Sequence, residues 1–245
     1  MINHSSLLAR STWAFAATLA LLLLALWWAL IASPSIYVAT SSSPAQASMA
    51  ITYRIFYYHA PAGMTAFVVL IGNALASIAY LVRRSRRADA LALACAEVGL
   101  AFLTINLITG PIWAHPAWGV WWVWDPRLTL TLALWVMFAS YLILRQLTPP
   151  GALQPRLAAV LSVFFAADVP IDYMAIRWWR NQHPSPVVFG GPNSGMAPRM
   201  WVAFGLSFSA FLALAVCLVW LRYRQELTRA RLVTLRQQRL LAQEV

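Results

Sequence analysis

The chain has 245 residues, of which 61% are hydrophobic and only 10% are charged, and its mean hydropathy is +0.67. Soluble domains are about half apolar, so this composition excludes a soluble globular protein and indicates an integral membrane protein. The formal net charge is +11, and every basic residue other than histidine is arginine. In a membrane protein such a charge is explained by topology and anionic lipid, so we expect no nucleic-acid partner.

Six apolar runs are each long enough to cross a bilayer, which takes roughly 20 residues per helix. They predict an all-α integral membrane protein with six transmembrane helices, forming one domain over residues 1–245. The runs cover residues 13–32, 61–82, 88–108, 128–144, 157–176 and 200–221. The first run exceeds the roughly 7 to 15 apolar residues of a signal peptide, so we expect it to be retained as a span.

The distribution of arginine predicts the orientation, because cytoplasmic loops carry the positive excess. With the N-terminus inside, 13 arginines fall on the cytoplasmic side and 5 on the other. We therefore expect both termini in the cytoplasm and the site-bearing loops in the periplasm, in a bacterial inner membrane.

Residues 222–245 mix arginines with apolar residues and predict a cytoplasmic basic amphipathic tail. Such a helix either lies on the anionic inner leaflet or docks on a cytoplasmic partner. A solvated charged helix is an equal alternative.

Four tryptophans fall within seven residues between the third and fourth predicted spans. They are Trp118, Trp121, Trp122 and Trp124. Indole is a large π surface with one polar atom, and it is favoured where one side is apolar and the other wet. The segment 109–129 therefore predicts an aromatic shelf at the outer membrane surface, with Asp125 and Arg127 at its rim.

Three of the four histidines, His59, His115 and His183, lie on the predicted outer side. His59 stands at the mouth of the second span, and His183 stands just beyond the fifth. One histidine in such a loop is ordinarily a surface residue. Two at matching depth beside a tryptophan shelf suit the two axial positions of a haem iron, and a rim arginine can pair with a haem propionate.

The run TGPIWAHPAWGVWWVWDPRLT at 109–129 resembles the WWD signature of haem-handling membrane proteins in cytochrome c assembly. Length and six spans are similar to the haem exporter protein C (CcmC) family of the system I machinery. RIFYYHAP at 54–61 is similar to that family's first histidine motif. VPIDY at 169–173, followed by two tryptophans and His183, is similar to its second. The resemblance spans roughly residues 50 to 215.

The resemblance implies a haem-handling transport subunit and not an enzyme. Members of the family receive haem at the outer face and present it to a periplasmic haem chaperone, which becomes covalently loaded. The ligand implied is haem b, held transiently. The residues implied are His59 and His183 as axial ligands, Trp118, Trp121, Trp122 and Trp124 as the platform, and Asp125 and Arg127 fixing the loop or the haem edge.

The resemblance also implies partners. They are the chaperone, the ATPase and membrane subunits of an ABC transporter, a small single-span membrane subunit, and the lipid bilayer. The chain has no Walker loop, so ATP hydrolysis belongs to another chain. It has no Cys-x-x-Cys-His motif, so we do not expect it to hold haem covalently as a c-type cytochrome does.

Around the second histidine the chain departs from the family, with Asn-Gln-His-Pro at 181–184 where relatives commonly have Thr-Leu-His-Gln. His115 stands where many relatives have a basic residue, which makes it a spare ligand or a propionate partner.

Three acids have more than one interpretation. Glu97, inside the third span, is either a structural hydrogen-bonding group or part of a substrate passage. Asp168 and Asp172 share one helix face and either face the haem site or pair with Arg177 or Arg199.

Two other functions compete with haem delivery. A membrane redox protein using haem or quinone would need more histidines inside its spans. A structural permease subunit without haem would use its tryptophans only as an interfacial belt, which requires no Trp-Asp-Pro-Arg order.

Overall fold

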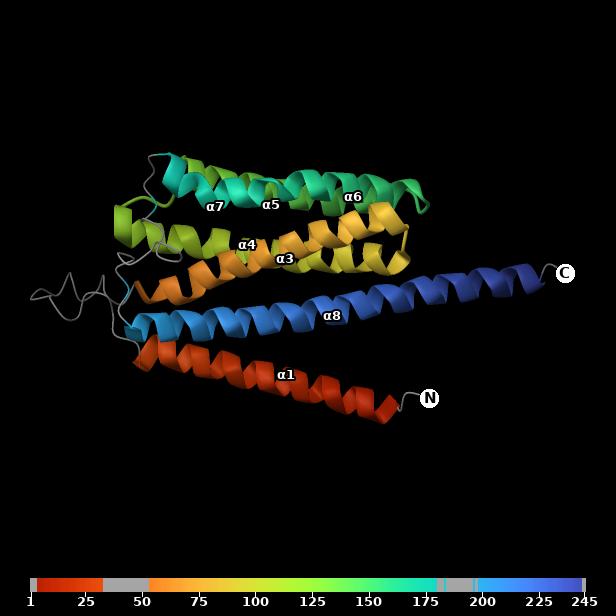
Figure 1. The fold of residues 1–245 in the computed structure, drawn as a ribbon, viewed down its shortest axis with the longest axis horizontal. Helices are drawn as coiled ribbons and strands as arrows, with labels where there is room; N and C mark the ends of the chain where they lie inside the picture. Colours follow the sequence, from red (N-terminus) through yellow and green to blue (C-terminus); the bar gives the residue numbers. More distant parts are fainter. Residues whose placement is uncertain (1–3, 33–52, 180–182, 184–195, 197, 244–245) are drawn as a thin grey trace, which may run out of the picture.

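A computed structural model gives the fold and describes residues 4–32, 53–179, 183, 196 and 198–243. Every regular element in these ranges is helical, and six helical segments are long and apolar enough to cross a membrane. The helices run roughly side by side along one axis (Figure 1). The prediction of an all-α protein with six spans is confirmed.

The six spans follow one another along the chain. The first consists of α1 (His4–Trp27) and a π-helical turn, η1 (Trp28–Ala32). The 3-10 turn η2 (Tyr53–Ile55) leads into α3 (Phe56–Arg83), which is followed by α4 (Arg86–Trp118) and α5 (Pro126–Leu147). The fifth span consists of α6 (Leu153–Ala166) and α7 (Asp168–Trp178), and the sixth belongs to α8 (Pro198–Gln243).

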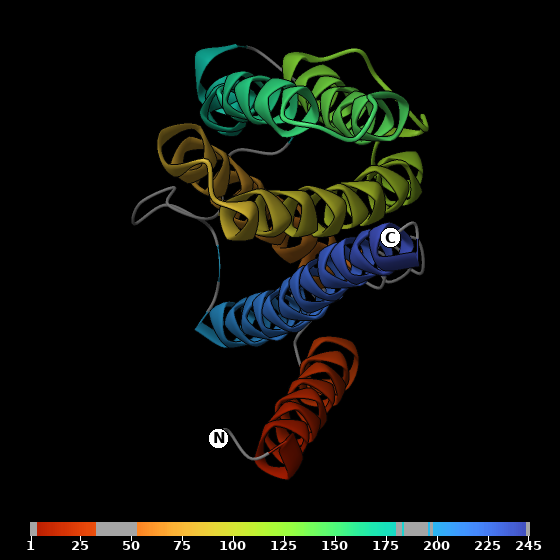
Figure 2. The same cartoon turned by 90° about the vertical axis from the view of Figure 1, so that its right-hand side faces the viewer.

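The helices form layers, which Figure 2 shows nearly end-on. On one side lie α5, α6 and α7, and α3 and α4 form the middle layer. Beyond them lies α8, and α1 packs outermost against α8. The start of α1 and the end of α8 lie at the same end of the bundle, together with the arginine-rich turn at 83–87 (Figure 1). We call this the inner end, and the opposite end the outer end.

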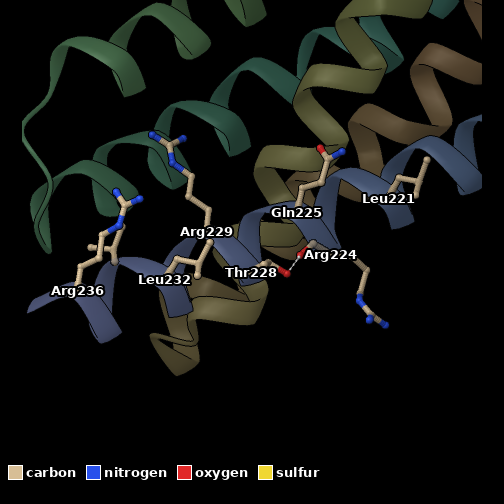
Figure 3. A pocket seen from close by; sticks show the side chains of 8 residues that line it. Leu221, Arg224, Gln225, Thr228, Arg229, Leu232 and Arg236 are labelled. Atoms are coloured by element: carbon tan, nitrogen blue, oxygen red, sulfur yellow. Dashed lines mark hydrogen bonds between the residues drawn. The ribbon is translucent and has the colours of Figure 1, made fainter. Parts of the chain in front are cut away.

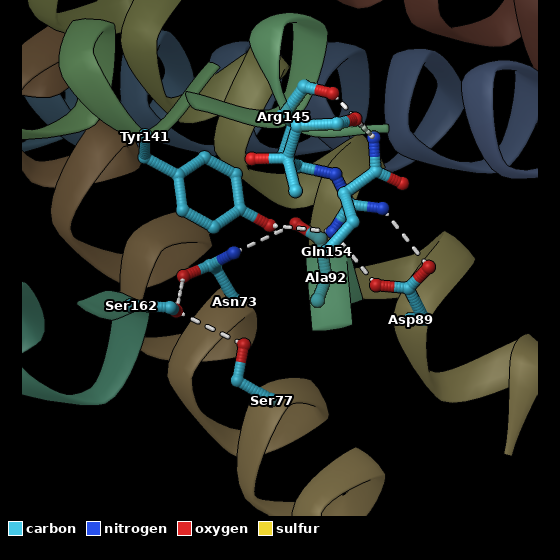
Figure 4. A network of polar contacts seen from close by, with 9 residues as sticks. Asn73, Ser77, Asp89, Ala92, Tyr141, Arg145, Gln154 and Ser162 are labelled. Atoms are coloured by element: carbon cyan, nitrogen blue, oxygen red, sulfur yellow. Dashed lines mark hydrogen bonds and ion pairs between the residues drawn. The ribbon is translucent and has the colours of Figure 1, made fainter. Parts of the chain in front are cut away.

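A buried polar network joins α3 to α4, α5 and α6 in the inner half (Figure 4). Arg145 donates to both carboxylate oxygens of Asp89, at 2.7 and 2.9 Å. Ser77 donates to Ser162 at 3.0 Å, and Ser162 donates to Asn73. Each of these polar groups has a hydrogen-bonding partner on a neighbouring helix. The network therefore holds the helices of the inner half together at no cost from unpaired buried groups.

Two predicted loops are helical instead. α3 begins at Phe56, before the predicted start at 61, so His59 lies in the first turn of α3 itself. α4 extends to Trp118, well past the predicted end at 108, with Pro111 and Pro116 inside it. A membrane helix tolerates proline where neighbouring groups satisfy the freed carbonyls. Only the part of segment 109–129 between α4 and α5 is therefore a loop.

The predicted fifth span is divided at Ala167. Pro170 has no N–H to donate to the carbonyl of Ala166, so the hydrogen-bond ladder is interrupted where α6 ends. This division starts α7 at Asp168 and places Asp172 in its second turn.

The predicted sixth span ends at 221, but α8 continues without a break to Gln243. Its 46 residues extend about 69 Å at 1.5 Å per residue, roughly twice the 30 Å of a hydrocarbon core. The tail therefore continues the axis of the span beyond the inner end of the bundle (Figure 1).

Candidate functional site

His59 is half-buried in the first turn of α3 and is held by α4. Its Nδ1 lies 3.0 Å from the hydroxyl oxygen of Thr109. The Asn106 amide donates to the His59 carbonyl at 2.9 Å, and its Nδ2 lies 3.4 Å from Nδ1. The Trp113 ring meets the imidazole edge-on, with centroids 5.7 Å apart. Three residues on one face of α4 thus determine the position of this imidazole.

Two glycines make this close approach of α3 and α4 possible. A Cβ on Gly63 would lie 2.7 Å from the Asn106 amide nitrogen, closer than the packed atoms can tolerate. A Cβ on Gly110 would lie 3.4 Å from His59 Cε1. The hydrogen bonds that fix His59 therefore depend on the absence of a side chain at position 63.

His183 is half-buried, and its neighbours in the sequence on both sides lie outside the described residues. It lies close enough to His59 for the two side chains to interact electrostatically. The Arg127 guanidinium is also within such a range of His59. The two histidines that the sequence singled out therefore lie within range of an electrostatic interaction. The residues at which the chain departs from the family pattern, 181–182 and 184, lie outside the described residues.

The tryptophans divide into two pairs. Trp118, the last residue of α4, and Trp122 are half-buried. Trp121 and Trp124 are 59% and 75% exposed. Gly119 ends α4 in the left-handed conformation, with φ of 75°, which favours glycine at a helix C-terminus. This turn leads the chain into the short loop that holds the exposed pair.

His115 lies in the last turn of α4 and is exposed, away from the contacts that hold His59. Its ring stacks on Trp121, with centroids 4.3 Å apart and planes at 24°. One face of Trp121 is therefore covered by imidazole, and only the other face is open to a flat ligand.

Asp125 and Arg127 both make contacts where the loop meets α5. Asp125 caps α5 by accepting from the N–H of Leu128 at 2.8 Å, and Pro126 follows at the first helical position. The Arg127 Nη1 donates to the carbonyl of Asp172 at 2.5 Å and lies 3.3 Å from its carboxylate. The Asp172 side chain is fully buried, so this ion pair fastens the start of α5 to α7.

The other acids differ in their surroundings. Asp172 pairs with Arg127, and not with Arg177 or Arg199 as one interpretation had it. Asp168 Oδ2 is buried and has no hydrogen-bond partner among the described residues. At the other end of the bundle, Glu97 forms an ion pair with Arg222 of α8, with 2.5 Å between Oε2 and Nε. This contact supports the structural interpretation of Glu97.

Sequence reasoning assigned no role to Asn106, Thr109, Trp113 or Thr131. The first three are spaced by three and four residues, which places them on one face of a helix. That signal was lost because the third span was predicted to end at 108. Thr131 lies one turn beyond Arg127 and places its hydroxyl 2.9 Å from the Asp172 carboxylate, a contact that only the tertiary structure reveals.

Comparison with known proteins places the chain in a family. The family model for CcmC, described as heme exporter protein C, matches residues 4–238. The chain belongs to the CcmC family. It is 31% identical to heme exporter protein C of Haemophilus influenzae over 86% of this chain and 81% of that protein. The protein of that name in Rhodobacter capsulatus is 31% identical over 94% and 91%, and that of Escherichia coli K12 is 30% identical over 74% and 73%.

In this CcmC-family chain the matched region contains the whole candidate site, because His59, the tryptophan loop and His183 all fall within residues 4–238. The arrangement provides two imidazoles and a partly exposed aromatic surface at one end of a bundle. Neutral imidazole is a common metal ligand, and indole rings pack against flat aromatic molecules.

The ion pair between α5 and α7 yields a prediction. Asp172→Asn should lower the free energy of unfolding by about 3 kcal/mol, because it leaves the Arg127 guanidinium without its counter-charge. Asp168→Asn is the matched control on the same helix, and it should be neutral or stabilising because the carboxylate oxygen Oδ2 is buried without a hydrogen-bond partner among the described residues. Unfolding of the purified protein in detergent measures both, and equal stability of the two variants would contradict the assignment.

Proposed function

We propose that this CcmC-family chain captures haem b at the periplasmic face of the bacterial inner membrane and presents it to a periplasmic haem chaperone during cytochrome c maturation. The observation that carries the proposal is the proximity of His59 and His183 at the end of the bundle that bears the tryptophan loop. In this proposal the two imidazoles are the axial ligands of the iron.

The donor set suits a porphyrin. Among the described residues, no group of three or more histidine, cysteine, aspartate or glutamate side chains is placed to hold a bare metal ion. Haem iron needs only two ligands from the protein, because the porphyrin supplies four nitrogens. A pair of histidines is therefore sufficient for this ligand.

The exposed tryptophans supply the apolar surface that a porphyrin needs. Trp121 and Trp124 expose large ring areas to solvent at the outer end, a costly arrangement unless a ligand or the membrane interface covers them. Because Trp121 is stacked on His115, it offers haem one face. Trp118 and Trp122 support the loop from behind and complete the platform in this proposal.

Holding haem for hand-over requires a site that is open on one side. The iron ligands come from the first turn of α3 and from beyond α7, both at the outer end. Covalent attachment then takes place on the chaperone, so this chain acts as a transport subunit. The redox alternative finds less support, because His59 and His115 lie in terminal turns and no histidine of the described spans lies mid-membrane.

Partners on the inner side are proposed to be the ATPase and membrane subunits of an ABC transporter, with a small single-span subunit in the membrane. The tail of α8 offers a surface for this contact. One face forms a groove of about 670 Å³ lined by Leu221, Arg224, Gln225, Thr228, Arg229, Leu232, Val233 and Arg236. Figure 3 shows Arg229 and Arg236 extending to the same side of the helix. These arginines suit an acidic protein surface.

The ligand assignment is tested by His59→Ala and His183→Ala. Each should lower the haem content of the detergent-purified protein by about 10-fold or more, because a single remaining imidazole leaves one axial position open. Soret absorbance per polypeptide measures the content, and His4→Ala at the inner end is the control. Unchanged absorbance in both single variants would refute the assignment.

The platform is tested by Trp124→Ala. It should weaken haem binding about 2- to 10-fold, because one ring–ring contact is worth roughly 0.5 to 1.5 kcal/mol. Trp13→Ala is the matched control, since Trp13 is also 75% exposed but lies towards the inner end of α1. Haem titration followed by tryptophan quenching measures the affinity. Equal affinity of both variants would show that Trp124 does not contact haem.

The tail is tested by truncation after Arg224, which spares the Glu97–Arg222 ion pair. Co-purification of the transporter subunits should fall while the haem content stays the same. The double variant Arg229→Gln/Arg236→Gln should act in the same direction, whereas Arg86→Gln/Arg87→Gln, at the same end but on α4, should not. Full recovery of the complex with the truncated chain would exclude the tail as a docking site.

A further inference from the structure

The hydrogen bonds around Thr109 determine where its only hydroxyl proton goes. The Thr109 Oγ1 lies 2.7 Å from the carbonyl oxygen of Ile105, 3.2 Å from that of Asn106 and 3.0 Å from His59 Nδ1. A carbonyl oxygen can only accept, and a hydroxyl donates one proton. The shortest contact takes that proton, so Thr109 donates to Ile105 and its oxygen remains an acceptor for His59.

The same accounting fixes the tautomer of His59. A neutral imidazole carries one N–H, and the Thr109 oxygen accepts it at Nδ1. The Asn106 amide donates one of its two N–H groups to the His59 carbonyl at 2.9 Å, and the other would have to reach Nδ1 across 3.4 Å. That distance is longer than an ordinary hydrogen bond, so the 3.0 Å contact with the Thr109 oxygen decides the tautomer. With the proton on Nδ1, the lone pair lies on Nε2, the nitrogen that remains for a metal.

We propose that Thr109, supported by Asn106, is a positioning residue that fixes the ring and tautomer of His59 and so presents Nε2 to the haem iron. This inference rests on the proposed function, because it assigns a role to Thr109 only if His59 is a ligand. Ligating histidines elsewhere commonly donate their second N–H to an oxygen acceptor, which orients the ring and raises its basicity. Here the acceptor comes from the neighbouring helix.

Gly63 is also needed for the contacts that position His59. The Asn106 amide fills the space that a side chain on Gly63 would take, and a Cβ there would lie 2.7 Å from its nitrogen. A methyl group at position 63 therefore displaces Asn106 without contacting the imidazole directly. The substitution Gly63→Ala therefore tests the Asn106 contact while leaving the His59 side chain itself unchanged.

The first test compares Thr109→Val with Thr109→Ser. Valine keeps the shape and removes the acceptor, so haem affinity should fall about 10- to 100-fold, the usual effect of losing such a partner. The reduction potential of the bound iron should shift in the positive direction, because a less basic imidazole stabilises ferric iron less well. Serine restores the hydroxyl and should restore both values.

Two matched controls isolate the effect. Thr234→Val removes a threonine that makes the same back-bond to the carbonyl four residues earlier, at 3.1 Å, but lies in the tail. Gly63→Ala should weaken haem binding as Thr109→Val does. Gly72→Ala, on the same helix, should not, because its Cβ would meet only Cys95 Sγ at an ordinary 3.8 Å.

The outcomes separate this inference from the proposed function. If His59→Ala retains haem, the proposed ligand is wrong. If His59→Ala loses haem while Thr109→Val matches Thr109→Ser in affinity and potential, the ligand stands and the positioning role is overturned. If Thr109→Val does not fold, Gly63→Ala decides: unchanged affinity and potential relative to Gly72→Ala overturn the inference.

Discussion

The close packing of α3 against α4 at the outer end is the contact on which the site depends. Gly63 lets the Asn106 amide approach α3, and Thr109 reaches the ring of His59 from the next turn of α4. An imidazole in the first turn of a helix would otherwise be free to rotate. Because α4 continues past its predicted end at 108, Asn106 and Thr109 share one helical face towards α3, and this face holds the ring.

A second set of contacts holds the tryptophan loop in place. Asp125 caps α5, and Arg127 in its first turn pairs with the fully buried Asp172 of α7. A buried ion pair adds little net stability compared with apolar packing, but it specifies one arrangement of the groups it joins. Here it joins the end of the tryptophan loop to the helix that leads towards His183. The loop and His59 are thus attached to one framework of α3, α4, α5 and α7.

The sequence was sufficient for the architecture and the family, because six long apolar runs and the Trp-Asp-Pro-Arg order are local signals. The sequence was insufficient for the helix boundaries near prolines. The helix α4 continues through Pro111 and Pro116, whereas the fifth span divides beside Pro170. Local propensity cannot distinguish these cases, since neighbouring helices decide whether freed carbonyls are satisfied. The partner of Asp172 was equally out of reach, because a pairing across 45 positions leaves no trace in periodicity.

The most direct test of the account is the electron paramagnetic resonance spectrum of the ferric, haem-loaded protein. Two imidazoles on one iron should give a low-spin signal, with His59→Ala and His183→Ala each converting the remaining haem to a high-spin form. A high-spin spectrum of the unmodified protein, or a low-spin spectrum that survives both substitutions, would contradict the claim that His59 and His183 share one iron.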